Sequence, residues 1–242
     1  MSAAIEFRDV SYRIGAKQIL SHLSLRVDAG ERLVLLGRSG SGKTTALKMV
    51  NGLVQPTEGV VLVEGKPTTE WDLVRLRRRI GYVIQEAGLF PHFTVAQNVG
   101  LVPRLEGWPP LRIDARTQEL LPMMDLAPAQ FLDRYPRELS GGQRQRVGVA
   151  RALAADPPVL LLDEPFGALD PVTRHEIQRQ FLRVCERLGK TVIFVTHDAR
   201  EALLIATRIG LLREGRLESL ESPGSFMNAR GEEAEAFRAC LG

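Results

Sequence analysis

The sequence predicts an α/β protein in which helices cover both faces of a parallel sheet. Strands that are buried on both faces are typically short and continuously apolar. Four such runs occur, at residues 33–36, 80–84, 159–162 and 192–195. Alternation of apolar and polar residues at 5–12 and 23–27 instead predicts two antiparallel strands, joined by the turn Gly15-Ala16-Lys17. The expected architecture therefore combines a parallel core with an antiparallel part.

Helical periodicity dominates residues 95–153, where six prolines predict short helices rather than long ones. Two helix starts are marked by a hydroxyl residue followed three positions later by glutamine, Thr94 with Gln97 and Ser140 with Gln143, as in a capping box. Asp170 followed by proline predicts the start of a long helix over 171–188. Residues 95–153 are therefore expected to form a helical subdomain that is inserted in the sheet.

Composition and charge narrow the class of protein. The 242 residues are 44% hydrophobic and 25% charged, as in a globular domain with a core. The formal net charge of +3 is too small to indicate nucleic-acid binding. The apolar runs are too short for a membrane span, and no signal segment opens the chain, so we expect a cytoplasmic protein or the peripheral part of a membrane assembly. Two cysteines lie far apart in sequence and are expected to be reduced thiols.

A phosphate-binding loop follows the first apolar run. Residues 37–44 fit the pattern G-x-x-x-x-G-K-[ST] between a predicted strand and a predicted helix that extends to Val50. Glycines let backbone N–H groups turn toward an anion, and the helix N-terminus adds its positive dipole end. Lys43 is expected to reach the β- and γ-phosphates of a nucleotide, and the Thr44 hydroxyl to bind Mg²⁺.

Polar residues end the other predicted parallel strands. The run 159–162 ends in Asp163-Glu164, at the sheet edge where ligands bind in α/β proteins. We expect Asp163 to support magnesium and Glu164 to deprotonate the water that attacks the γ-phosphate. Gln85 and His197 follow two further strands and are expected to lie near the phosphate loop.

The segment Leu139-Ser140-Gly141-Gly142-Gln143 resembles the signature motif of ATP-binding cassette (ABC) proteins. Seven motifs stand in the family's order along almost the whole chain. They are Tyr12, residues 37–45, Gln85, residues 139–143, residues 160–164, residues 167–170 and His197.

The resemblance implies a P-loop NTPase (RecA-like) core with an antiparallel β subdomain and a helical subdomain at about 88–155. One nucleotide-binding domain would span 1–242 and end in a short helical tail at about 223–242, whose acidic helix, 232–240, is expected to cap the domain. We therefore expect no regulatory domain of the kind that some relatives append.

The resemblance also implies roles for individual residues. Two such domains would close head to tail, with ATP between the phosphate loop of one and the signature helix of the other. Catalytic roles would fall to Glu164, His197, Gln85 and Lys43, and metal binding to Thr44, Gln85 and Asp163. ATP contacts would come from Tyr12, Gly37, Arg38, Ser39, Gly40, Ser41, Gly42, Lys43, Thr44, Thr45, Ser140, Gly141, Gly142, Gln143 and Asp170.

A transporter of this family would need separate membrane subunits. The resemblance places their contact at residues 85–94, from Gln85 to Thr94, and makes a solute-binding protein an indirect partner. The stretch around Phe90 and Trp108 is similar to importers of glycine betaine, carnitine and choline. Three alternatives stay open: an importer of an amino acid, polyamine or inorganic anion, a soluble cassette ATPase outside transport, and a phosphate-binding module without catalysis.

Overall fold

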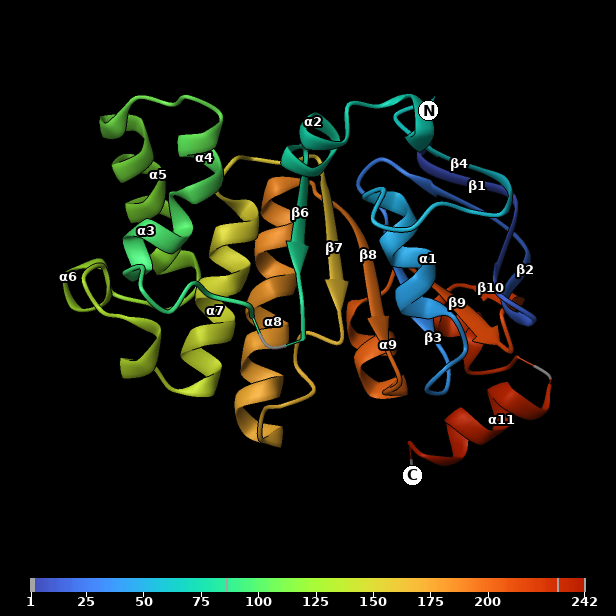
Figure 1. Cartoon of the computed structure of the whole chain (residues 1–242). Helices are drawn as coiled ribbons and strands as arrows, with labels where there is room; N and C mark the ends of the chain where they lie inside the picture. Colours follow the sequence, from blue (N-terminus) through green and yellow to red (C-terminus); the bar gives the residue numbers. More distant parts are fainter. Residues whose placement is uncertain (1–2, 86, 230, 242) are drawn as a thin grey trace. The chain divides into compact units, whose positions relative to one another are not determined.

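The computed structural model describes residues 3–85, 87–229 and 231–241 and divides into two compact units. The first unit consists of the chain up to Arg77 together with the chain from Lys190 onward, and the second consists of Arg78–Gly189. Figure 1 labels the helices and strands of each unit.

The first unit contains an antiparallel sheet with strand order β2-β1-β4-β5. Its central strand β1 (Ala3–Ile14) pairs with β2 (Lys17–Asp28) and with β4 (Glu58–Val63), and β5 (Lys66–Pro67) follows β4. Ile5 lies opposite both Val27 and Val63 in this ladder. The turn between β1 and β2 uses Gly15 in the left-handed region, at φ 58°.

The second sheet region of the first unit has the order β10-β9-β3-β8. Strand β3 (Arg32–Leu36) runs parallel to β8 (Thr191–Thr196) and to β9 (Arg208–Arg213), while β10 (Arg216–Glu221) returns antiparallel to β9. Every residue of β8 is buried, as expected for a strand covered on both faces. The helices of this unit are α1 (Lys43–Val50), the 3-10 turn Thr68–Glu70, α2 (Leu73–Arg78), α9 (Ala199–Ile205), α10 (Pro223–Phe226) and α11 (Glu232–Ala239).

The second unit is built around two parallel strands, β6 (Ile80–Val83) and β7 (Val159–Asp163). Its helices are α3 (Val95–Val99), α4 (Leu101–Leu105), α5 (Pro110–Met123), α6 (Pro128–Phe131), α7 (Gly141–Leu153) and α8 (Pro171–Leu188), with the 3-10 turn Pro136–Glu138 before α7. Helix α7 packs so closely on β6 that a Cβ at Gly81 would lie 2.4 Å from the Ala152 carbonyl oxygen.

The structure confirms most of the predicted elements. All four apolar runs form strands, both capping boxes are present, and α8 spans the residues predicted for it. The strands β4, β5, β9 and β10 were not predicted. Pro103 and Pro122 lie inside α4 and α5 rather than between helices, whereas other prolines begin α5, α6 and α8. Among the described residues, no helix has both the length and the apolar character that crossing a membrane requires.

Candidate functional site: a phosphate loop and two strand ends

The phosphate loop joins the end of β3 to the start of α1, and its glycines are required by space as well as by conformation. Gly40 and Gly42 have φ values of 81° and 99°, in the region that L side chains rarely adopt. A Cβ at Gly37 would lie 2.3 Å from the Leu212 carbonyl oxygen, so only glycine fits there. The loop therefore exposes backbone on its inner side, as an anion-binding turn does.

The side chain of Lys43 is held over this loop. Its Nζ donates hydrogen bonds to the carbonyl oxygens of Gly37 at 2.7 Å and Arg38 at 2.8 Å, and the residue is only 4% exposed. A buried ammonium group is stable only where such partners surround it. The positive charge and the N-terminus of α1 thus face the same loop, which suits a phosphate.

Tyr12 lies on β1, beside the strand β2 that packs against the phosphate loop. Its cross-strand partner is Leu20. A Cβ placed on Gly42 would come within 2.6 Å of the Leu20 side chain, so these two residues are in close contact. The structure therefore brings the predicted adenine-stacking residue to the same part of the first unit as the loop.

His197 lies in the tight turn between β8 and α9 and is exposed. The Thr196 hydroxyl accepts a hydrogen bond from the amide of Asp198 at 3.0 Å, and Asp198 caps α9 by accepting from the amide of Arg200 at 2.8 Å. This pair of bonds fixes the backbone on both sides of His197 at the end of β8.

In the second unit, Asp163 is the last residue of β7 and Glu164 is the first residue beyond it. Glu164 has a φ of 44°, an uncommon value for a residue other than glycine. Strained backbone of this kind clusters at functional sites. Burial, with the negative charge of Asp163 as a smaller cause, raises the pKa of Tyr82 to about 12. That tyrosine therefore stays neutral at physiological pH.

Gln85 and Glu164 belong to neighbouring loops of the second unit. The Gly167 amide donates to the Glu164 carbonyl oxygen at 3.3 Å, and a Cβ on Gly167 would lie 3.8 Å from Gln85 Nε2. Gln85 lines a cavity together with Gly141 and Ala168, among others. The structure thus places Gln85 beside the turn that follows β7.

The signature segment begins α7. The Ser140 hydroxyl accepts from the Gln143 amide at 3.2 Å and the Gln143 side chain accepts from the Ser140 amide at 2.9 Å, completing the predicted capping box. Gly142 lies against α8, because a Cβ there would be 2.7 Å from Thr173 Cγ2. Backbone hydrogen bonding from Thr173 lowers the pKa of Asp170, which caps α8. The starts of α7 and α8 therefore lie together.

The loop of residues 87–94 is held by two side chains for which the sequence indicated no role. The guanidinium of Arg151 donates to the carbonyl oxygens of Ala87 at 2.6 Å and Gly88 at 2.7 Å, and burial lowers the pKa of Arg151. Asn98, fully buried, binds the other end of the loop through Phe90 and Phe93. Glu86, in the predicted interface, lies outside the described residues.

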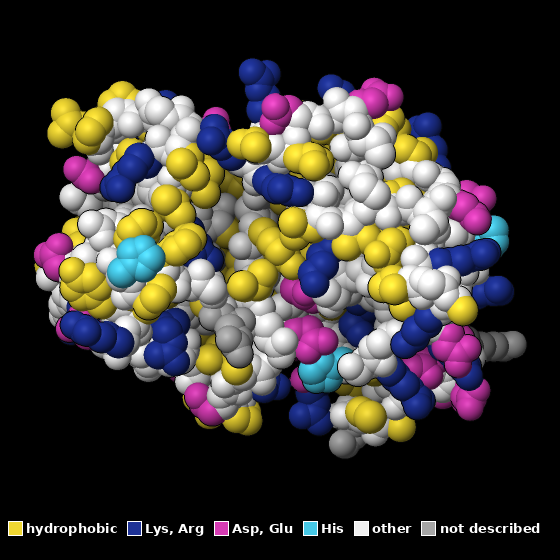
Figure 2. Space-filling model, viewed as in Figure 1, with side chains coloured by type: hydrophobic (Ala, Val, Ile, Leu, Met, Phe, Trp, Pro, Cys, Tyr) yellow, Lys and Arg dark blue, Asp and Glu magenta, His cyan; other side chains and the backbone are white. Residues whose placement is uncertain are grey.

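These two anchors leave apolar side chains at the surface. Phe90 is 42% exposed and Ile84 is 40% exposed, and the rings of Phe90, His92 and Phe93 contact one another. Hydrophobic side chains and a histidine gather on the face over α3 and α6 in Figure 2. The loop therefore presents an aromatic patch on a fixed backbone.

Comparison with known proteins identifies the family. The family model described as "ABC transporter" matches residues 20–167. The chain belongs to the ABC transporter family. The cassette is 52% identical over 208 residues to the osmoprotectant import ATP-binding protein OsmV of Salmonella typhimurium, covering 86% of this chain and 54% of that protein. It is 48% identical over 224 residues to the glycine betaine/carnitine/choline transport ATP-binding protein OpuCA of Bacillus subtilis, covering 92% and 59%.

A solved structure supports the fold of the cassette. The dimeric post-hydrolysis state of the ATP-binding cassette MJ0796, bound to ADP and Pi, matches with a TM-score of 0.81 and 35% identity, over 94% of this chain and 100% of that chain. The predictions of family and of a P-loop NTPase fold are confirmed. The cassette spans somewhat more than half of the length of the first curated relatives, between 54% and 59%.

Proposed function

We propose that this chain binds and hydrolyses ATP and that hydrolysis powers the import of a small solute through separate membrane subunits. The observation that carries the proposal is the phosphate loop with the buried Lys43 bonded across it, in a chain that belongs to the ABC transporter family. The names of the relatives, transport and import ATP-binding proteins, support the same function.

The residues fit a nucleotide phosphate chain. Lys43 would exchange its bonds to the Gly37 and Arg38 carbonyl oxygens for bonds to the β- and γ-phosphates. Tyr12 would stack on the adenine. Hydroxyl, amide and carboxylate oxygens of Thr44, Gln85 and Asp163 are donors that Mg²⁺ prefers, and the ion would neutralise charge that develops on the phosphates.

Hydrolysis needs one proton acceptor. We assign it to Glu164, whose carboxylate would take a proton from water as the water oxygen bonds to the γ-phosphorus and the bond to the ADP oxygen breaks. The left-handed backbone at Glu164 supports this role, since it turns the residue out of the line of β7. His197 would hold the γ-phosphate, and Gln85 would hold the water.

The signature segment is proposed to act on a second copy of the chain. Residues Ser140–Gln143, at the start of α7, have the dipole and amide groups that suit a γ-phosphate, and Asp170 begins the neighbouring helix. ATP would therefore join two chains, and loss of the γ-phosphate would release them. The dimeric state of MJ0796 supports this arrangement.

The membrane partner is proposed to bind the aromatic patch around Phe90, on the cytoplasmic side of the membrane. An exposed apolar patch on a rigid loop is typical of a protein interface. We propose osmoprotectants of the quaternary amine class as the solute, on the basis of the relatives' names. A solute-binding protein would be an indirect partner.

One substitution tests the enzymatic part. Glu164→Gln should abolish steady ATP hydrolysis, retain ATP binding, and accumulate a closed dimer in size-exclusion chromatography with ATP. The Asp163→Asn variant is the matched control, because it should weaken magnesium binding, and so raise the Mg²⁺ concentration that hydrolysis needs, without trapping the dimer. Hydrolysis by Glu164→Gln at the wild-type rate would overturn the assignment of the base.

Uptake of radiolabelled betaine by vesicles containing the assembled transporter tests the solute.

A further inference from the structure

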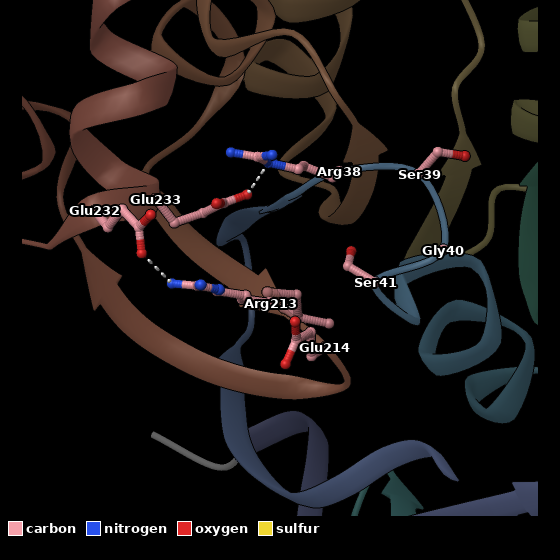
Figure 3. Close-up of a pocket in the computed structure, with 9 residues that line it drawn as sticks. Arg38, Ser39, Gly40, Ser41, Arg213, Glu214, Glu232 and Glu233 are labelled. Atoms are coloured by element: carbon pink, nitrogen blue, oxygen red, sulfur yellow. Dashed lines mark hydrogen bonds and ion pairs between the residues drawn. The ribbon is translucent and has the colours of Figure 1, made fainter. Parts of the chain in front are cut away.

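An ion pair joins helix α11 to the phosphate loop. Arg38 Nε, in the loop, donates to Glu233 Oε1 at 2.9 Å (Figure 3). The Glu233 side chain is 4% exposed, whereas that of Arg38 is 69% exposed. A buried carboxylate depends on its partner far more than an exposed guanidinium does, so the pair fixes Arg38 relative to α11.

The rest of α11 is attached to parts of the first unit other than the loop. Glu232 pairs with Arg213 of β9 at 3.2 Å, and Arg238 donates to the carbonyl oxygen of Phe226 at 3.3 Å. Arg200, in α9, donates to the Cys240 carbonyl oxygen at 3.4 Å. The helix therefore has a docking site that does not depend on Arg38, and it can act as a fixed support for the loop.

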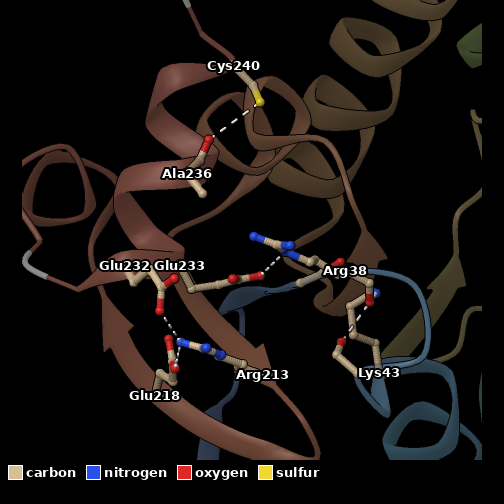
Figure 4. A network of polar contacts seen from close by, with 10 residues as sticks. Arg38, Lys43, Arg213, Glu218, Glu232, Glu233, Ala236 and Cys240 are labelled. Atoms are coloured by element: carbon tan, nitrogen blue, oxygen red, sulfur yellow. Dashed lines mark hydrogen bonds and ion pairs between the residues drawn. The ribbon is translucent and has the colours of Figure 1, made fainter.

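Arg38 connects α11 to the catalytic lysine. Its side chain binds Glu233, and its backbone carbonyl oxygen accepts a hydrogen bond from Lys43 Nζ at 2.8 Å (Figure 4). Glu233 also lines, with Ser39 and Ser41, the cavity that opens beside the loop. Arg38 therefore contacts both Glu233 and Lys43, so that a movement of Glu233 can reach Lys43 through Arg38 alone.

We propose that Glu233 is a positioning residue for nucleotide binding: it holds Arg38, and with it the turn of the phosphate loop that orients Lys43. The inference rests on the proposed binding of ATP. Because the loop is held in shape before the nucleotide arrives, less conformational entropy is lost on binding. Loss of the ion pair between Arg38 and Glu233 should therefore weaken ATP binding while leaving the chemical step largely unchanged.

The test is the equilibrium affinity of the whole chain for ATP with Mg²⁺, measured by titration calorimetry, together with the KM and kcat of phosphate release. Glu233→Gln should raise the dissociation constant and KM roughly three- to tenfold, with kcat within about twofold of wild type. Glu232→Gln is the matched control, because it removes an adjacent negative charge that pairs with Arg213 instead of Arg38. This control variant should keep the affinity for ATP within about twofold of the wild-type value.

A double-mutant cycle separates positioning from simple electrostatics. Arg38→Ala should weaken ATP binding as Glu233→Gln does. The double variant should bind ATP no less tightly than whichever single variant has the lower affinity. Because the Arg38 side chain is exposed, this variant tests the pair even where the buried position tolerates no change. Additive losses, equal losses in Glu232→Gln and Glu233→Gln, or unchanged affinity in both Arg38→Ala and Glu233→Gln would overturn the inference.

Failure of the proposed function gives a different result. A wild-type chain that binds ATP without hydrolysing it refutes the ATPase proposal, while the comparison of dissociation constants still decides the role of Glu233. A wild-type chain that hydrolyses ATP, with Glu233→Gln binding as tightly, refutes only the positioning role. A wild-type chain that binds no ATP overturns both.

Discussion

The side chain of Asn98 binds both the amide nitrogen and the carbonyl oxygen of Phe90, at 2.8 and 3.2 Å. The same amide group donates to the carbonyl oxygens of Phe93 and Thr94 at 3.1 and 3.0 Å. One buried side chain therefore satisfies several backbone groups of a loop and leaves the Phe90 ring partly in solvent. The loop needs no regular secondary structure to keep its shape.

Replacing Asn98 by alanine should lower the free energy of unfolding by ~3 kcal/mol, because a buried amide nitrogen and several carbonyl oxygens lose their partner. Urea denaturation followed by circular dichroism measures this. Gln97→Ala is the control, since it removes an exposed capping side chain and should cost only ~1 kcal/mol. Equal losses in the two variants would contradict the role assigned to Asn98.

Replacing Phe90 by serine should lower the unfolding free energy by only ~1 kcal/mol, because the residue is already 42% exposed. The isolated chain should hydrolyse ATP at the wild-type rate, and co-purification with the membrane subunits should be lost. Leu111→Ser, at an 84% exposed position on α5, is the control and should leave co-purification intact. Retention of the membrane subunits by the Phe90 variant would exclude this patch as their binding site.

Gly42→Ala should weaken ATP binding by tenfold or more, since the added methyl group would lie 2.6 Å from the Leu20 side chain at a residue with φ 99°. Gly30→Ala is matched in conformation, with φ 78°, but has nothing within 4 Å of the new methyl group. It should cost only ~1–2 kcal/mol of stability and leave the affinity unchanged. Calorimetric titration with ATP compares the two, and a similar loss of affinity in both variants would contradict this account of the loop.

The Asp170 carboxylate should make the stability of the chain depend on pH in a defined window. Hydrogen bonds from the start of α8 lower its pKa in the folded state. Its contribution to the free energy of unfolding is therefore fully present above the ordinary carboxyl pKa of about 4. That contribution is lost as pH falls through the lowered, folded-state pKa. The difference in Tm between wild type and Asp170→Asn should therefore be constant near neutral pH and shrink in acid.

Asp133→Asn provides the control for that pH profile, because it removes an exposed carboxylate that caps no helix in the described structure. Its Tm difference from wild type should show no comparable change between neutral and acid pH. A profile for Asp170→Asn that is flat across the same range would refute the stabilising contact with α8.

Local sequence signals predicted the local structure around most of the candidate site. The phosphate loop, Ser140 and Asp170 were predictable because each depends on neighbours in sequence: glycines that permit unusual backbone angles, and polar side chains that cap the helix they begin. The same holds for the buried strands, because a short continuous apolar run predicts a strand that is buried on both faces.

Contacts between distant parts of the chain left no such signal. Arg38 and Glu233 are 195 positions apart, and nothing in an acidic helix near the end of the sequence indicates which basic residue it meets. Asn98 and Arg151 act on carbonyl oxygens, which every residue carries, so their partners cannot be read from residue types. The strand β10 was missed because it mixes charged and apolar residues without clear alternation, and β9 because Gly210 interrupts a short apolar run between two arginines.

The two cysteines differ in a way that has a practical use. Cys185 is buried in α8, whereas Cys240 is exposed and lies with His197 and Phe237 around one cavity. A maleimide fluorophore should therefore label the native sequence at a single position, without engineered cysteines. Its emission would report movement of the chain next to His197 when nucleotide is added, giving a real-time optical signal from an unmodified sequence.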